Sequence, residues 1–212
     1  MASESLSKSE ETRERIIAAA YRLFQQKGYA GTSIRDIAEA AGLTTGGIYG
    51  RFASKEDIWS AVFEAKHPYH QMIPLLLAAQ GDDPETFIRD AAHRFVEELS
   101  RHEDLFNLLF IEAVEFKGRN IAPLAVELAE PIAQLGQKLT SHPERLREVN
   151  PVTLARAFGS LFFMYHVTDL FMPPQIKALV DPHVALDEFI DIFLHGVLAD
   201  PPADGQAGAE VP

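Results

Sequence analysis

The chain begins with an apolar pattern of helical spacing. Ser7 and Glu10 have the spacing of a capping box, in which each caps the other's backbone N–H at a helix start. A stripe of apolar residues at positions i, i+3 and i+4 follows and continues to Gly28, a residue typical of helix ends. The pattern predicts one long amphipathic first helix.

A second and much shorter stripe follows. Ser33 and Asp36 repeat the capping box, and the apolar spacing stops at Gly42 after barely two turns. New helix starts follow at Thr44 and at Ser54. Two short helices joined by a tight glycine turn predict a helix-turn-helix.

The remainder of the chain contains helical stripes separated by proline signals, and no convincing alternating strand. Proline signals at His67-Pro68 and Pro74 should end or kink the helix that starts at Ser54. A single helix kinked at Pro131 is expected over Leu124 to Leu139. Further helices are predicted over residues 84–99, 105–116, 151–171 and 186–198. We therefore expect an all-α protein.

The amino-acid composition argues against disulfide-bonded, metal-binding and membrane proteins. The chain of 212 residues contains no cysteine, which excludes disulfides and thiolate metal sites, and its scattered histidines predict no metal or cofactor. No apolar stretch reaches the roughly 20 residues needed to cross a bilayer, and no signal peptide is evident. We expect a soluble, cytoplasmic protein without a membrane partner.

Charge is distributed unevenly along the chain. The formal net charge of −12 argues against nucleic acid binding by the protein as a whole. Residues 12–55, however, carry seven basic and three acidic side chains, a balance of +4 that leaves −16 for the rest. A basic head on an acidic body predicts that the head alone approaches DNA.

The segment Thr44 to Tyr49 departs from helix propensity. Each of its adjacent glycines, Gly46 and Gly47, costs roughly 1 kcal/mol relative to alanine inside a helix. A helix without bulky side chains can bring its backbone close to another surface, and the threonine and tyrosine hydroxyls suit phosphate oxygens and base edges. The alternative is a flexible glycine-rich loop that binds nothing. The segment is neither a Walker loop nor a dinucleotide fingerprint, because no Gly-Lys-Ser/Thr follows and no strand precedes.

Three runs, Thr32–Ala38, Gly42–Tyr49 and Phe52 with Ser54–Asp57, resemble the tetracycline-repressor (TetR/AcrR-like) family. The resemblance covers roughly residues 10 to 65. It implies an all-helical homodimer with two DNA-reading heads and a C-terminal domain for dimerisation and a small-molecule effector. It also implies base contacts for Arg35, Thr45, Gly46 and Gly47, and phosphate contacts for Thr32, Thr44, Tyr49 and Lys55. Ser33 completes this predicted DNA-binding set.

Two positions differ from the family pattern. Gly50 stands where the family usually has a larger residue, and Arg51 where it has histidine or another aromatic residue. We expect Arg51 to contribute more than usual to phosphate or guanine contact. For Lys55, an ordinary solvated lysine is the alternative to a phosphate ligand.

The predicted domains are residues 7–53 for DNA binding, 54–198 for effector binding and dimerisation, and a disordered tail at 199–212. Polar residues within apolar helices predict either internal ion pairs or an effector site. The effector set, which suits a lipophilic molecule with a cation or hydrogen-bond donors, is Phe110, Glu112, Phe116, Phe162, Tyr165, His166 and Asp169. The predicted dimer interface is Phe158, Phe171, Phe189, Phe193 and Val197.

The sequence thus predicts a ligand-responsive repressor that binds a palindromic double-stranded operator as a dimer. An activator or an effector-independent DNA-binding protein on the same fold is the main alternative. A small all-helical enzyme is a remote one, because no nucleophile or nucleotide-binding motif is present.

Overall fold

The computed structural model describes residues 7–102, 104–139 and 147–197, and every regular element in these ranges is a helix. The chain forms two compact units. The first unit contains the described residues up to Pro68 together with those from His102 to Val126. The second contains Tyr69 to Arg101 and the described residues from Glu127 onward. Each unit is described separately below.

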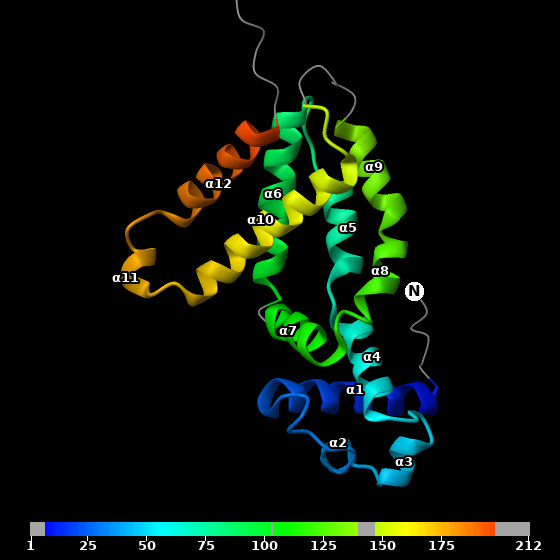
Figure 1. Cartoon of the computed structure of the whole chain (residues 1–212). Coiled ribbons are helices and arrows are strands. Elements are labelled where there is room, and N and C mark those ends of the chain that lie inside the picture. Colours follow the sequence, from blue (N-terminus) through cyan, green and yellow to red (C-terminus); the bar gives the residue numbers. More distant parts are fainter. Residues whose placement is uncertain (1–6, 103, 140–146, 198–212) are drawn as a thin grey trace, which may run out of the picture. The chain divides into compact units, whose positions relative to one another are not determined.

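In the first unit, α2 packs against α1, and α3 against α2 (Figure 1). Helix α1 also packs along α4. The capping boxes at Ser7 and Ser33 form as predicted, each serine side chain accepting the N–H of the acidic residue three positions on. The helices of this unit are α1 (Lys8–Lys27), α2 (Ile34–Ala40), α3 (Thr45–Tyr49), α4 (Lys55–Lys66), α7 (Leu105–Phe116) and α8 (Ile121–Glu127).

Aromatic side chains form the core of the first unit. Phe24 of α1 and Trp59 of α4 are almost completely buried, with their ring centroids 5.5 Å apart. Phe116, at the end of α7, stacks on Trp59 with a centroid distance of 5.4 Å and an interplanar angle of 4°. Burial of rings of this size supplies much of the stability of a small helical unit.

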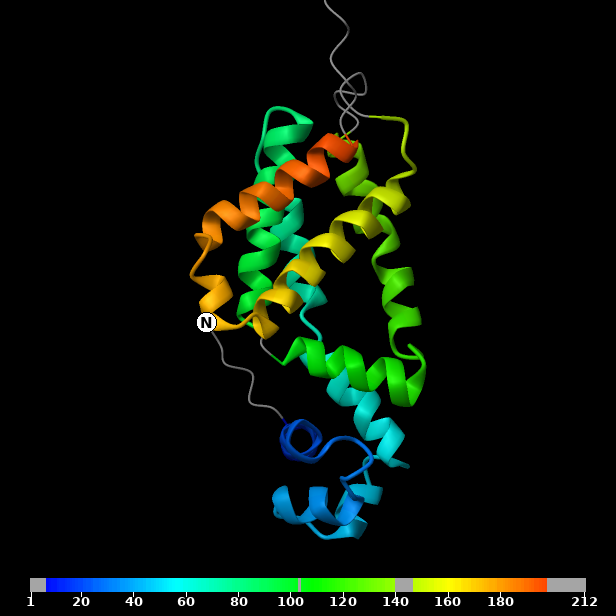
Figure 2. The same cartoon turned by 60° about the vertical axis from the view of Figure 1, so that its left-hand side comes forward.

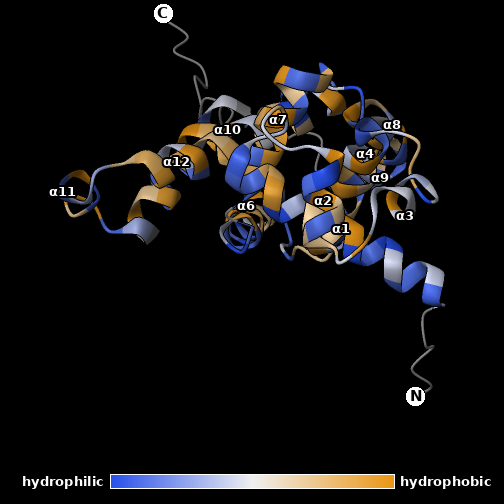
Figure 3. Cartoon of the chain, turned by 90° about the horizontal axis from the view of Figure 1, so that it is seen from below, coloured by the Kyte–Doolittle hydropathy of each residue, from blue (hydrophilic) through white to orange (hydrophobic). Residues whose placement is uncertain are grey.

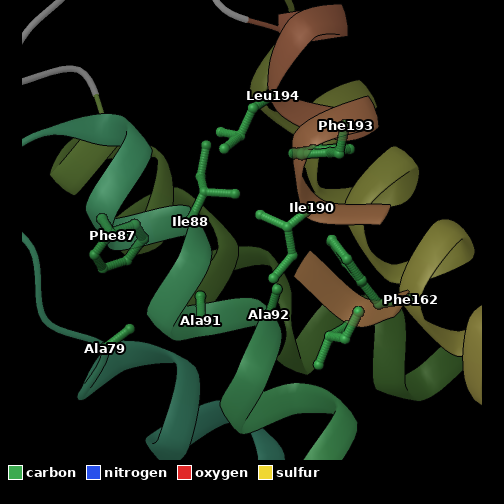
Figure 4. Packing of buried hydrophobic residues seen from close by; sticks show 10 residues of the cluster. Ala79, Phe87, Ile88, Ala91, Ala92, Phe162, Ile190, Phe193 and Leu194 are labelled. Atoms are coloured by element: carbon green, nitrogen blue, oxygen red, sulfur yellow. The ribbon is translucent and has the colours of Figure 1, made fainter. Parts of the chain in front are cut away.

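In the second unit, α6, α10 and α12 lie side by side (Figure 2), and α6 also packs against α5. Apolar residues from these helices meet in a common core. In Figure 4 the side chains of Ile88 on α6 and of Ile190 and Leu194 on α12 face one another. The helices of this unit are α5 (Tyr69–Leu77), α6 (Pro84–Ser100), α9 (Ala129–Leu139), α10 (Pro151–Phe171), α11 (Pro174–Lys177) and α12 (Pro182–Val197).

Most helix bounds agree with the sequence pattern, but prolines produced two differences. The expected single helix over residues 124–139 is divided into α8 and α9 at Leu128, whose carbonyl accepts the N–H of Ile132. Pro131 has no N–H to bond across the junction, so a break replaces the predicted kink. Helix α4 ends before His67 as predicted, whereas Pro74 lies inside the separate helix α5.

Among the described residues, no helix combines the length and the apolarity that crossing a membrane requires. The predicted tail at residues 199–212 lies outside the described residues.

Candidate functional site

The turn between α2 and α3 depends on glycine. Gly42 has a φ of +67°, in the left-handed region that residues with a Cβ rarely adopt. A Cβ built there would also lie 3.2 Å from Nη2 of Arg15. After the turn, Thr44 caps α3, its hydroxyl oxygen accepting the N–H of Gly47 at 3.1 Å. The two helices thus have the predicted helix-turn-helix connection.

The two glycines of α3 are not required by packing within the protein. A Cβ added to Gly46 would meet only the Thr44 hydroxyl oxygen, at 3.8 Å, and Gly46 is exposed. A Cβ on Gly47 would touch Leu43 and Thr44 at 3.6 Å, which is ordinary van der Waals contact. Neither glycine has a positive φ. Alanine would therefore fit at both positions, and the fold itself does not explain the two glycines.

Most of the predicted DNA-binding residues are exposed on this part of the first unit. Tyr49 presents 57% of its surface to solvent although it is a large aromatic residue. Arg51, also exposed, donates from Nη1 to the Gly47 carbonyl at 3.4 Å. The other exposed members of the set are Ser33, Arg35, Thr44, Thr45 and Gly46, whereas Gly47 is half-buried.

Thr32 does not match its predicted role. Thr32 is only 2% exposed, and its hydroxyl donates to the carbonyls of Gly28 at 2.9 Å and Leu23 at 3.3 Å. Its backbone N–H donates to the Tyr29 carbonyl. The Thr32 side chain is therefore hydrogen-bonded to carbonyls at the C-terminal end of α1 and does not face a phosphate.

Lys55 has an internal role that the sequence did not reveal. Its ammonium donates to the carbonyls of Tyr29 and Thr32, each at 2.9 Å, and lies 4.1 Å from the centroid of the Tyr29 ring. These two bonds use two of its three N–H groups. Lys55 therefore fastens the start of α4 to the loop after α1, and phosphate contact through the remaining N–H stays a prediction.

For Glu112 the structure supports the internal alternative over the effector role. The residue is fully buried, and its carboxylate accepts from Trp59 Nε1 at 2.7 Å. It also accepts from the backbone N–H of Asn120 at 2.7 Å and from Nδ2 of Asn120 at 2.8 Å. Of its predicted neighbours in the effector set, Phe116 stacks on Trp59 and Phe110 is 57% exposed.

The remaining residues of that set belong to the second unit. Asp169 forms an ion pair with Lys177 at 2.9 Å, and the Tyr165 hydroxyl donates to the Pro182 carbonyl. Phe162 is a core residue. Burial lowers the pKa of His166 below its ordinary value, since desolvation disfavours the charged ring.

A cavity of about 240 Å³ lies within the second unit, and none of the seven predicted effector residues lines it. Phe158 and Phe193, both predicted at the dimer interface, are among its walls, and Phe193 is only 7% exposed. Phe193 is therefore an interior residue, and its predicted interface role was wrong. The cavity is lined by Ile73, Leu76, Phe87, Ile88, Ala91, Phe95, Leu128, Ile132, Leu135, Gly136, Pro151, Leu154, Ala155, Phe158, Gly159 and Phe193.

Apolar side chains are also exposed along α10 to α12, where Figure 3 shows a mostly hydrophobic ribbon. Phe171 is 68% exposed, in keeping with its predicted place at an interface, and Phe189 is half-buried against Tyr165. The structure describes no side chain for Val197. Among the side chains that the structure describes here, ten large apolar ones are exposed, namely Val152, Met164, Leu170, Phe171, Met172, Ile176, Leu179, Val180, Val184 and Ile192.

Comparison with known proteins bears on the first unit in particular. Residues 16–62 match the model of the bacterial regulatory proteins of the tetR family. The HTH-type transcriptional regulator AcrR of Shigella flexneri is 44% identical over 64 residues, which span only 30% of this chain and 30% of AcrR. The HTH-type transcriptional regulator YvkB of Bacillus subtilis is 24% identical over 89% of this chain and 98% of its own length.

Solved structures extend the likeness to the fold. NalD of Pseudomonas aeruginosa, described as the secondary repressor of the MexAB-OprM multidrug efflux pump, aligns with a TM-score of 0.63 at 25% identity. That alignment covers 92% of this chain and 100% of NalD. The match to the tetR family of bacterial regulatory proteins thus covers residues 16–62, and the chain as a whole shares the fold of NalD.

Proposed function

We propose that this protein is a transcriptional repressor that binds a palindromic DNA operator as a homodimer and is released by a small molecule. Residues 7–53 would form the DNA-binding part and residues 54–198 the effector-binding and dimerisation part. Support comes from the family and from relatives named as transcriptional regulators or, in the case of NalD, as a repressor.

One observation carries the DNA-binding proposal. Helix α3 combines an exposed glycine that the protein's own packing does not require with a tyrosine that is 57% exposed. Each feature is unfavourable in isolation, because glycine weakens a helix and an exposed aromatic ring remains in contact with water. Both are explained if a DNA duplex approaches the Gly46 backbone and the Tyr49 hydroxyl contacts phosphate.

The exposed apolar residues of α10 to α12 support the homodimer. Leu179, Phe171 and Ile192 are 75%, 68% and 66% exposed, respectively. Large apolar side chains exposed in this number on helices that pack together, such as α10 and α12, are typical of an interaction site. A second copy of the chain is the occupant we propose, since two symmetric copies would cover the same surface on each other and would supply the two heads that a palindrome requires.

Selection from a random pool of DNA duplexes tests the DNA-binding proposal and identifies the operator in the same experiment. We expect recovered sequences to share an inverted repeat, and the affinity for them to fall steeply with salt, as phosphate contacts require. Tyr49→Ala should weaken binding to every recovered sequence. Failure to enrich any duplex would contradict the proposal. Transcription that rises when the protein is added would favour the activator alternative.

A further inference from the structure

The chemistry of the cavity in the second unit is unusually uniform. Its lining combines aliphatic residues, phenylalanines, glycines and a proline, and among the described residues it includes no charged side chain, hydroxyl or side-chain amide. Its walls come from α5, α6, α9, α10 and α12, with Leu128 between α8 and α9. A ligand within it would meet apolar carbon and rings on all of these sides.

Two charged side chains of the second unit have partners outside the cavity lining. Lys138 donates from its ammonium to the Leu77 carbonyl and lies 5.5 Å from the Phe87 ring centroid, and it is exposed rather than part of the lining. Asp169, one of the carboxylates expected to attract a cation, is paired with Lys177 and does not line the cavity. A cation buried in such surroundings would lose its hydration without gaining a counter-charge.

We infer that this cavity binds a neutral, apolar molecule of about the size of two fused aromatic rings and discriminates against cations. The inference rests on the proposed function in one respect, namely that the second unit is the effector-binding part. It replaces the expectation of a cationic or hydrogen-bonding effector.

The volume sets the size of the ligand. An apolar cavity of roughly 150 Å³ binds benzene, and drug-sized ligands occupy pockets of about 300–1,000 Å³. The volume of this cavity, about 240 Å³, lies between the benzene-sized cavity and the smallest of these drug-sized pockets. A cavity of this volume can hold a bicyclic hydrocarbon. A larger effector would require the cavity walls to move.

Gly159 is a lining residue at which a Cβ can be added without a clash. It lies on α10 among the lining residues, and a Cβ built on it would meet no atom within 4 Å. A leucine at this position therefore has room for its first side-chain atom and reduces the space left for a ligand. Ala155, one turn earlier on α10, also lines the cavity and provides a second filling variant.

Two probes of nearly the same shape test the inference. 1-Methylnaphthalene is neutral, and N-methylquinolinium carries one positive charge on an almost identical bicyclic frame. We expect calorimetric titration of the full-length protein to give at least tenfold tighter binding of the neutral probe. Equal or tighter binding of the cation, or no binding of either probe, would overturn the inference.

Variants locate the binding site. Gly159→Leu and Ala155→Leu should each weaken binding of 1-methylnaphthalene at least tenfold, whereas Ala133→Leu, at an exposed position on α9, should not. Thermal unfolding of all three checks that they remain folded. Unchanged binding in both filling variants would show that the probe binds elsewhere and would overturn the inference. Since none of these measurements contains DNA, failure of operator binding is a separate result that concerns only the proposed function.

Discussion

The indole nitrogen of Trp59 donates a hydrogen bond to Oε2 of Glu112 over 2.7 Å, and both residues are fully buried. The bond joins α4 to α7 inside the first unit, and Asn120 adds two further donors to the same carboxylate. A buried carboxylate is stable only when its oxygens are satisfied in this way. The bond therefore joins α7 to α4, the helix against which α1 packs.

Replacing Glu112 should destabilise the protein. Glu112→Gln places an amide N–H₂ where the Trp59 and Asn120 donors converge, so at least one donor is left unpaired, at a cost of about 1–3 kcal/mol in the free energy of unfolding. Urea unfolding followed by the fluorescence of Trp59, the single tryptophan of the chain, measures this loss. The exposed Glu115 on the same helix provides the control variant Glu115→Gln. Equal unfolding midpoints for the two variants would contradict the structural role of Glu112.

Lys55 should be required for stability as well as for DNA binding. Lys55→Met retains the apolar stem but removes the bonds to the Tyr29 and Thr32 carbonyls, and hydrogen bonds to charged groups contribute about 1.5–3 kcal/mol. We expect a lower melting temperature and weaker binding to all DNA sequences. Arg51→Met, which removes an exposed charge, should weaken DNA binding with little change in melting temperature. If Lys55→Met melts like the wild type, the two internal bonds contribute nothing measurable.

Dimerisation should depend on exposed apolar residues and not on interior ones. Ile192→Glu and Phe171→Glu introduce charge on side chains that are 66% and 68% exposed, so each monomer should fold normally but fail to pair. Phe193→Glu places a charge in the core and should instead unfold the second unit. Light scattering and helical circular dichroism distinguish these outcomes. Ile192→Glu and Phe171→Glu proteins that remain dimeric would place the interface elsewhere.

The stability of the protein should fall in mild acid, in part because of His166. Burial lowers the folded-state pKa of this histidine below its ordinary value of about 6.5, so the unfolded chain binds the proton more readily than the folded one. Its contribution is therefore complete above about pH 6.5 and is lost as the pH falls toward the folded-state pKa. Melting temperatures across this window should decline less for His166→Gln than for wild type. Identical declines would show that His166 is not responsible, and His195→Gln, an exposed site, is the matched control.

Features determined by neighbouring residues could be predicted from the sequence, whereas those determined by distant ones could not. The capping boxes at Ser7 and Ser33 involve residues three positions apart, and both form as predicted. The partners of Glu112 and Lys55 include residues 53 and 26 positions away, respectively, and no local pattern identifies them.

Helical periodicity also did not determine which apolar residues of α12 face the core. Phe189 and Phe193 are four residues apart and share a stripe, yet Phe193 is in the core and Phe189 is only half-buried. A helix with a wide apolar stripe can pack against the core of its own chain with some of these residues and against a second subunit with others. The sequence pattern does not show which residues do which. The same ambiguity explains why residues of the cavity wall were predicted at the dimer interface.

The two adjacent glycines of α3 allow the most direct test of whether this helix reads DNA. Gly46→Ala and Gly47→Ala should both stabilise the fold by about 0.4–1 kcal/mol, because a Cβ fits at each position and restricts the unfolded chain. Only the Cβ at the exposed Gly46 should obstruct DNA, since the Cβ at Gly47 points to Leu43 and Thr44. Fluorescence anisotropy with a selected operator should therefore show about tenfold weaker binding for Gly46→Ala and nearly unchanged binding for Gly47→Ala. A Gly46→Ala protein that is more stable and binds its operator as tightly as wild type would contradict the assignment of α3 as the DNA-reading helix.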